Sequence, residues 1–253
     1  MKNQEQTTVI SQNAISKLTP RKPCLSKGFT LAEILITLTV IGVVAALTIP
    51  TLLQNTNQAE LKTALKRDFA DLSQATLSIK NDLGGSFVNA FPGDWTGSES
   101  LKNAFKGKLS YIKECRGTTT WGGSGTGASA EGCWHGANEW QALSGAKLAE
   151  ETPSGLILSN GTLMFFISER SNCTLDLNPY GGTYKRCGFI DIDVNGFKKP
   201  NTMGKDIFEF SVTSDTLIPA GAQGFFVPEI TCIEGSTDIT NRGHGCTAKY
   251  LYE

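Results

Sequence analysis

The chain has 253 residues, of which 40% are hydrophobic and 19% charged, and its formal net charge at pH 7 is -1. The length predicts one or two domains. The composition suits a globular body that carries an apolar element. The balanced charge argues against bulk nucleic-acid binding, which needs a basic stripe.

The N-terminal part of the chain divides into a basic segment and an apolar segment. Residues 1–28 carry five basic residues against one acidic residue, a net of +4, which leaves -5 for the rest. From Phe29 to Leu53, Glu33 is the only charged residue, and these 25 residues can cross a hydrocarbon core of ~30 Å as a helix. Because basic residues mark the cytoplasmic side of a span, we predict that the C-terminal body crosses the membrane. A buried core helix is the alternative, although such helices seldom run this long without a polar face.

Glu33 needs an explanation, because a carboxylate in a membrane span costs roughly 2.5–3.5 kcal/mol. Cleavage between Gly28 and Phe29 would create an α-amino group four residues before Glu33, one helical turn away. This amine, or that of a neighbouring subunit, would offset much of the cost. The alternative is an ordinary signal peptide that is cut after the apolar segment.

The stretch "KGFTLAEILITLTVIGVVAALTIP", residues 27–50, resembles the N-terminal signature of type IV pilins and of the pilin-like subunits of type II secretion systems, the pseudopilins. In that family a membrane aspartyl peptidase cuts after the Gly and then N-methylates the exposed Phe, and the Glu guides filament assembly. The resemblance implies that Gly28 ends the leader, that Phe29 becomes the methylated N-terminus and that Glu33 is the assembly carboxylate. It is close over about 25 residues.

The resemblance also implies a function, a location and partners. We expect a structural subunit of a type IV pilus-like filament, not an enzyme, and we favour a type II secretion pseudopilin. A surface or competence pilin and a membrane-tethered tip adhesin are the alternatives. The expected partners are a prepilin peptidase/methyltransferase, copies of this chain, other pilin-like subunits and an inner-membrane assembly platform. The expected location is the bacterial inner membrane, crossed once with the head outside the cytoplasm, and then an extracytoplasmic filament.

An amphipathic pattern follows the apolar segment directly. Gly42 and Pro50 fall where the family tends to carry a Gly and a Pro, and we expect Pro50 to kink a helix that runs from Leu31 to Leu83. The two glycines after Leu83 should end this helix. The predicted apolar stripe on the second half consists of Leu61, Leu65, Phe69, Leu72, Ile79 and Leu83.

The remainder reads as an antiparallel sheet with one further helix. Residues 98–114 are the best helical candidate, and residues 116–138 are rich in Gly, Ser and Thr, which favours an irregular surface loop. Residues 155–169 read as two strands joined by a turn at Asn160-Gly161. Two further strands are expected at residues 187–194 and 206–212.

The predicted fold class is therefore α+β, with a long N-terminal helix, half transmembrane and half amphipathic, packed on a small antiparallel sheet in a pilin-like manner. The predicted domains are the leader 1–28, which is removed, the transmembrane and assembly segment 29–53, the amphipathic continuation 54–84, and the disulfide-bearing extracytoplasmic head 85–253.

Cysteine content agrees with a head outside the cytoplasm. Of seven cysteines, Cys24 would leave with the leader, and an even set of six remains. We predict disulfides between near neighbours in the sequence, which are Cys115–Cys133, Cys173–Cys187 and Cys232–Cys246. A zinc site with His135 and His244 is the alternative, but no C-x-x-C pair supports it.

One segment of the head resembles the front half of a calcium loop. Asp191, Asp193 and Asn195 stand at positions 1, 3 and 5 of such a loop, while Thr202 stands where a bidentate Glu is required. Asp206 could substitute from farther along. Some secretion pilins bind calcium in a head loop, which adds support. The alternative is a strand followed by an Asn-Gly turn, so the cofactor expectation is none or Ca²⁺.

The sequence carries no catalytic motif. Its two histidines, His135 and His244, both lie in glycine-rich stretches, and no phosphate loop or hydrolase elbow is present. Trp121, Trp134 and Trp140 cluster around the Gly-rich stretch. We expect them to pack in the core or at its rim, and the alternative is an exposed binding patch, which an adhesin would use.

Overall fold

The structure, a computed structural model, describes residues 28–117, 127–129, 131–149, 154–176, 185–222 and 232–253. The chain divides into two compact units, one that ends at Pro50 and one from Thr51 to Glu253, here called the head. One helix, α1 (Leu31–Asp82), contributes to both units and contains Pro50 in its interior. The predicted helix from Leu31 to Leu83 is thus confirmed to within one residue.

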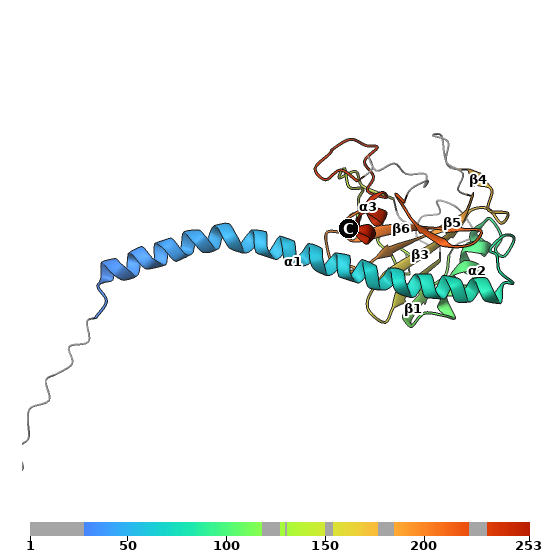
Figure 1. Cartoon of the computed structure of the whole chain (residues 1–253), viewed down its shortest axis with the longest axis horizontal. Helices are drawn as coiled ribbons and strands as arrows, with labels where there is room; N and C mark the ends of the chain where they lie inside the picture. Colours follow the sequence, from blue (N-terminus) through green and yellow to red (C-terminus); the bar gives the residue numbers. More distant parts are fainter. Residues whose placement is uncertain (1–27, 118–126, 130, 150–153, 177–184, 223–231) are drawn as a thin grey trace, which may run out of the picture. The chain divides into compact units, whose positions relative to one another are not determined.

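The head contains one antiparallel sheet of seven strands (Figure 1). Six strands follow the order β1-β2-β3-β5-β6-β7, and β4 pairs with β5. The α+β prediction is therefore confirmed. The strands are β1 (Tyr111–Cys115), β2 (Ser154–Leu158), β3 (Leu163–Ser168), β4 (Leu175–Asp176), β5 (Lys185–Asp193), β6 (Ile207–Thr213) and β7 (Leu217–Pro219).

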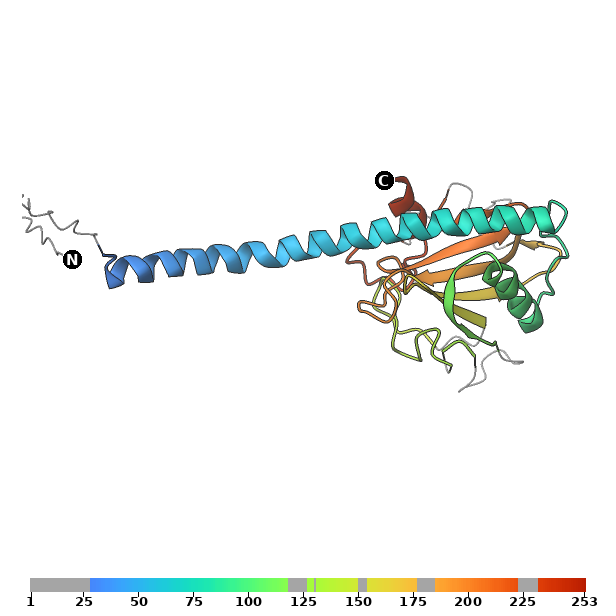
Figure 2. The ribbon, with the colours of Figure 1, turned by 90° about the horizontal axis from the view of Figure 1, so that it is seen from below.

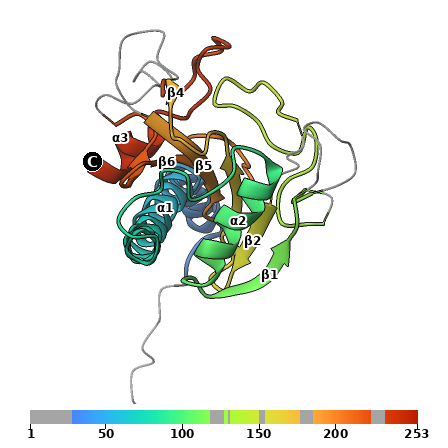
Figure 3. The same cartoon turned by 90° about the vertical axis from the view of Figure 1, so that its right-hand side faces the viewer.

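One face of the sheet packs against the head's part of α1 and against α2 (Trp95–Lys106) (Figures 2 and 3). The buried core on this face includes Leu65, Leu72, Ile79, Phe105, Phe166, Ile190, Phe208 and Phe210. The predicted apolar stripe is buried at Leu65, Leu72 and Ile79. It is half-buried at Leu61 and Phe69. Leu83 does not belong to the core, because it is 40% exposed after the helix has ended.

The opposite face of the sheet is also covered. Trp134, Trp140 and Met203 pack there against alternate residues of β3 and against Ile207 of β6, and every residue of these two strands is buried. A Cβ atom at Gly155 would lie 2.9 Å from the Cβ atoms of Ala128 and Cys133, so glycine in β2 lets this covering segment approach closely. The predicted surface loop at 116–138 is therefore buried in part.

Two helical predictions need correction or addition. The predicted helix at 98–114 is right up to Lys106, but Tyr111–Cys115 is strand β1, paired with β2. Tertiary pairing overrides the local helical pattern there. The short helix α3 (Cys246–Tyr252) was not predicted, and its Tyr250 ring packs on Phe208.

The Asn160-Gly161 turn joins β2 and β3 as predicted, and it is tied to α1. Asp68 of α1 is fully buried and accepts hydrogen bonds from Asn160 Nδ2 at 2.9 Å and Thr162 Oγ1 at 2.7 Å. Burial raises the pKa of Asp68, and these two bonds and Arg67 offset part of that rise. The carboxylate therefore fixes the position of α1 along the hairpin.

Candidate functional site: the N-terminal helix start

The helix start contains the predicted processing and assembly residues. Glu33 Oε2 accepts hydrogen bonds from the backbone N of Thr30 at 2.8 Å and from Thr30 Oγ1 at 2.9 Å. Thr30 Oγ1 in turn accepts from the backbone N of Glu33 at 3.2 Å. This reciprocal pattern is a capping box, which satisfies backbone N–H groups at the helix start. Glu33 therefore has a partner within its own chain.

Thr30 is the residue that the sequence reasoning missed. The signal was present, because Thr30-Leu31-Ala32-Glu33 has the S/T-x-x-E spacing of a capping box. The structure brings Gly28, Phe29 and Glu33 into one short segment ahead of and within the first helical turn. Phe29 N is a peptide nitrogen in this uncleaved chain and would become the new α-amine on cleavage.

The apolar segment that follows is exposed on all sides within the chain. Residues Leu31–Pro50 are long and apolar enough to cross a membrane, with a mean hydropathy of 2.3, and no part of that stretch is buried. Leu31 is 78% exposed and Leu47 is 72% exposed. Such a surface is unfavourable in water, so it requires lipid or other apolar helices around it.

Polar groups within this segment are satisfied internally, as lipid requires. Thr37, Thr39 and Thr48 each donate the side-chain hydroxyl to the carbonyl one turn earlier, at 2.9, 2.7 and 2.9 Å. These hydroxyls therefore add little cost to burial in a hydrocarbon environment.

Two glycines in this region have no side chain or backbone packed against them among the described residues. A Cβ atom added at Gly28 or at Gly42 would meet no atom within 4 Å. The described part of the chain therefore gives no packing reason for glycine at either position. A peptidase active site at Gly28 and a closely packed neighbouring helix at Gly42 are contacts with another molecule that would favour a small residue.

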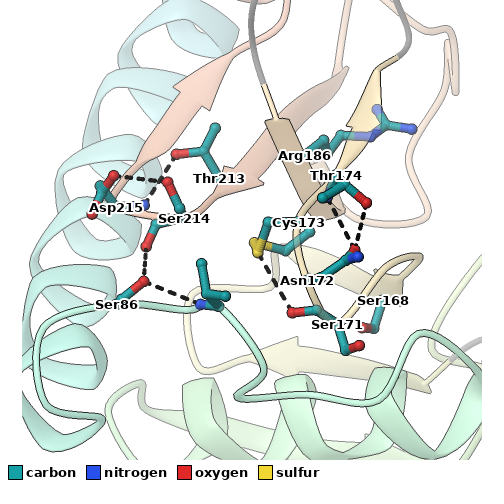
Figure 4. The surroundings of a disulfide bond; sticks show 12 residues. Ser86, Ser168, Ser171, Asn172, Cys173, Thr174, Arg186, Thr213, Ser214 and Asp215 are labelled. Atoms are coloured by element: carbon teal, nitrogen blue, oxygen red, sulfur yellow. Dashed lines mark hydrogen bonds between the residues drawn. A yellow bond between two sulfur atoms is a disulfide. The ribbon is translucent and has the colours of Figure 1, made fainter.

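The six head cysteines form three disulfides, Cys115–Cys133, Cys173–Cys187 and Cys232–Cys246. These are the pairs predicted from the sequence. Figure 4 shows the loop that carries Cys173 beside the segment that follows α1. There the Ser171 carbonyl accepts from the backbone N of Asn89 at 2.5 Å, and Ser86 Oγ donates to the Ser214 carbonyl at 3.1 Å. The disulfide thus reinforces the junction between α1 and the sheet.

The candidate calcium ligands lie at the end of β5 but have other partners. Asp193 Oδ2 is 2.8 Å from His135 Nε2, and both side chains are buried. Asp206 accepts from the backbone N atoms of Asn201 at 2.8 Å and Thr202 at 2.6 Å. Among the described residues, no group of three or more His, Cys, Asp or Glu could hold a metal ion. Asp193 and Asp206 are therefore engaged by residues of the head, and calcium binding stays a prediction from the sequence.

The disulfides overturn the zinc alternative, and two of the three tryptophans are buried. All six head cysteines are used in disulfides, which leaves no thiolate for a zinc ion beside either histidine. Trp134 is 1% exposed and Trp140 is 4% exposed, so neither forms an exposed binding patch. Trp121 lies outside the described residues.

A buried charge network occupies the same face of the sheet as these tryptophans. Arg186 contacts Glu169 through two nitrogens, at 2.6 and 2.7 Å, and Glu209 at 3.1 Å. His244 Nδ1 is 2.9 Å from Glu209 Oε2. Burial alone would raise the pKa of Glu209, but His244 and Arg186 lower it to about 2. The network is internally paired and therefore structural in character.

The comparisons agree with the geometry of the helix start. Residues 25–49 match the prokaryotic N-terminal methylation motif. This is the prepilin-type signal of type IV pilins and pseudopilins. No curated protein and no solved structure matches the chain.

The N-terminal segment therefore carries a prepilin-type signal, and this signal supports a type IV pilin-like subunit that is processed as a prepilin. The motif implies processing by a prepilin peptidase and assembly with other pilin subunits. It indicates a structural subunit, not an enzyme.

Proposed function

We propose that this chain is a subunit of a type II secretion pseudopilus, cleaved between Gly28 and Phe29 and N-methylated at Phe29. The observation that supports this proposal is the methylation motif at residues 25–49, followed by a helical segment whose apolar surface is not covered by any residue that the structure describes. An apolar helix exposed all round can be stored in a membrane and then transferred into a bundle of like helices.

The proposed orientation puts the head outside the cytoplasm. Five basic residues precede the apolar segment, which favours a cytoplasmic N-terminus. Three disulfides in the head suit an oxidising compartment. We propose the bacterial inner membrane as the first location, an inner-membrane platform as the assembly partner, and an extracytoplasmic filament as the product.

The proposed processing is tested by N-terminal mass spectrometry of the native protein. We expect a mature terminus of N-methylated Phe29. The Gly28→Ala variant tests the cut site itself. It should accumulate as the uncut chain if the peptidase requires a residue without a side chain. The substitution should not disturb the described part of the chain, because an added Cβ at this position would meet no described atom within 4 Å. A mature terminus beyond Ile49 would identify an ordinary signal peptide and would overturn the filament proposal.

The assignment to secretion is tested by deleting the gene in its host. Loss of secreted proteins from the medium, with surface filaments unchanged, is the expected result. Loss of surface filaments or of DNA uptake with normal secretion would instead identify a surface or competence pilin. Trp134 and Trp140 are buried, so the adhesin alternative would rest on Trp121, which lies outside the described residues.

A further inference from the structure

The segment between β5 and β6 exposes an aromatic ring among lysines. Phe197 is 53% exposed, although it lies in a head with two well-packed cores. Lys198 and Lys199 follow it directly and are exposed, and Lys205 of the same segment is exposed as well. An exposed aromatic side chain surrounded by cations is a common arrangement at membrane–water interfaces.

The ring is held in place by the core beneath it. It packs edge-on against the buried ring of His135, with centroids 5.5 Å apart. The segment is closed by Asp206, whose carboxylate accepts from the backbone N atoms of Asn201 and Thr202. Phe197 is therefore presented from a built loop, and its exposure is a property of the fold.

The lysines of this loop differ from several lysines of α1 and α2 and of the turn after α2. Several lysines of α1, of α2 and of the turn after α2 form ion pairs, namely Lys62–Glu253, Lys80–Asp215, Lys102–Glu99, Lys106–Glu114 and Lys108–Asp82. By contrast, Lys198, Lys199 and Lys205 form no ion pair with any residue that the structure describes. Their charges are therefore available to an external anion.

The loop lies at the end of the head that joins the apolar segment. A groove of about 410 Å³ is lined by Asn57 and Lys62 of α1 together with Pro200 and Lys205 of the loop. Asn57 follows Pro50 by seven residues, a distance of at most ~25 Å even for an extended chain. This bound holds whatever the angle between the two units.

We propose that Phe197, Lys198, Lys199 and Lys205 form a contact with anionic phospholipid headgroups while the subunit is anchored in the membrane. The anchoring itself rests on the proposed function. The ring would sit at the level of the headgroups, and the ammonium groups would bind lipid phosphates. Because residues 29–253 carry a net charge of -5, an anionic surface repels the head as a whole. A local basic patch is what allows close approach.

The contact is tested by photo-crosslinking in the full-length, processed chain within its native membrane. The photoreactive amino acid p-benzoylphenylalanine replaces Phe197, which it resembles in shape. The matched control places it at Val88, which is 42% exposed but follows the far end of α1. We expect a lipid adduct at position 197, identified by mass, and none at position 88.

Lipid specificity is tested in nanodiscs with the same chain. Anionic phosphatidylglycerol should raise the yield of lipid adduct over zwitterionic phosphatidylcholine alone. The double variant Lys198→Gln/Lys199→Gln should lower the yield in anionic discs by about fivefold for each lysine removed. The control variant Lys80→Gln/Lys108→Gln removes the same charge near the other end of α1 and should leave the yield unchanged.

Two results overturn the inference while the proposed function stands. One is a chain that resists carbonate extraction but gives no lipid adduct at position 197. The other is an adduct there with a protein, which would identify an interface between subunits. A chain that carbonate releases from the membrane overturns the anchoring and the inference together.

Discussion

Glu33 is placed to serve two different partners. In the uncleaved chain its carboxylate accepts from Thr30 N and Thr30 Oγ1 and so caps its own helix. After cleavage, the Phe29 amine becomes a cation within one turn. The capping box lowers the cost of keeping a carboxylate at the start of an apolar helix, because it supplies hydrogen bonds where lipid supplies none.

We predict that Glu33→Ala leaves membrane insertion and leader removal intact but prevents filament assembly. Removal of the carboxylate makes the segment more apolar, so insertion is not impaired. Assembly loses one half of a buried pair, at a cost of roughly 3–5 kcal/mol per subunit. Sheared-filament yield and N-terminal sequencing of the membrane fraction are the measurements.

The conservative variant Glu33→Gln separates the cap from the charge. The amide oxygen of the glutamine can still accept a hydrogen bond from Thr30 N, so the capped helix start should persist in Glu33→Gln, as in the natural chain. Loss of filaments in both variants would assign assembly to the charge. Normal filaments in the alanine variant would show that Glu33 does not direct assembly.

Asp193 gives a pH prediction at the same scale. Burial, together with the nearby Asp206 carboxylate, raises the pKa of Asp193 well above its ordinary value of 3.8, and burial lowers the pKa of His135, whose Nε2 lies 2.8 Å from Asp193 Oδ2. A raised folded pKa means that the contribution of Asp193 to stability is fully present below 3.8 and is lost as the pH rises through the folded value.

Asp193→Asn should therefore gain stability relative to the natural chain as the pH rises above about 4. The measurement is urea unfolding of the processed chain in detergent at several pH values, with the difference in free energy of unfolding plotted against pH. A difference that stays constant, or that grows toward acid, would contradict the raised pKa.

At the scale of elements, the contact between α1 and the β2–β3 hairpin depends on one buried carboxylate. Asp68→Ala would leave the Thr162 hydroxyl and the Asn160 amide without their buried acceptor. We expect a loss of about 1–3 kcal/mol in the free energy of unfolding, since each unsatisfied group carries a desolvation penalty.

Thermal unfolding followed by circular dichroism measures this loss. Asp71→Ala is the matched control, because Asp71 is an exposed acid one turn later on the same helix. It should change stability by no more than about 0.5 kcal/mol. Equal effects of the two substitutions would show that helix propensity, and not the hairpin contact, accounts for the result.

The elements that local pattern could predict are those with local causes. The periodic stripe at Leu65, Leu72 and Ile79 and the Asn160-Gly161 turn are local, and both are found as predicted. β1 was read as helix because its partner, β2, lies some 40 residues away in the sequence. The second core was missed because Gly, Ser and Thr around Trp134 look like surface, and its burial depends on β3 and β6.

The functional residues also divide into those that a local sequence pattern predicts and those that depend on distant segments. Gly28, Phe29 and Glu33 could be proposed from one contiguous motif, because processing and assembly signals are read along the chain. The carboxylates at Asp191 and Asp193 also follow a local spacing, yet the partner of Asp193 comes from a distant segment. No local spacing predicts that His135 Nε2 forms a hydrogen bond with Asp193 Oδ2.

At the scale of the whole molecule, the disulfides and the leader give a paired prediction. The processed chain should contain no free thiol under denaturing, non-reducing conditions, because all six remaining cysteines are bonded. The unprocessed chain should label once with an alkylating reagent, at Cys24. Mass spectrometry of both forms, with Cys24→Ser as the control, measures this. Two or more labelled thiols in the processed chain would refute the pairing.

The continuity of α1 has a mechanical consequence. The helix that carries the apolar segment also places Leu65, Leu72 and Ile79 in the core of the head. Tension applied along residues 31–50 therefore reaches the head through the helix that carries this buried stripe. The head cannot be detached by stretching the chain unless the stripe is first drawn out of its own core. In this molecule the part that bears load and the part that stabilises the fold are the same set of side chains.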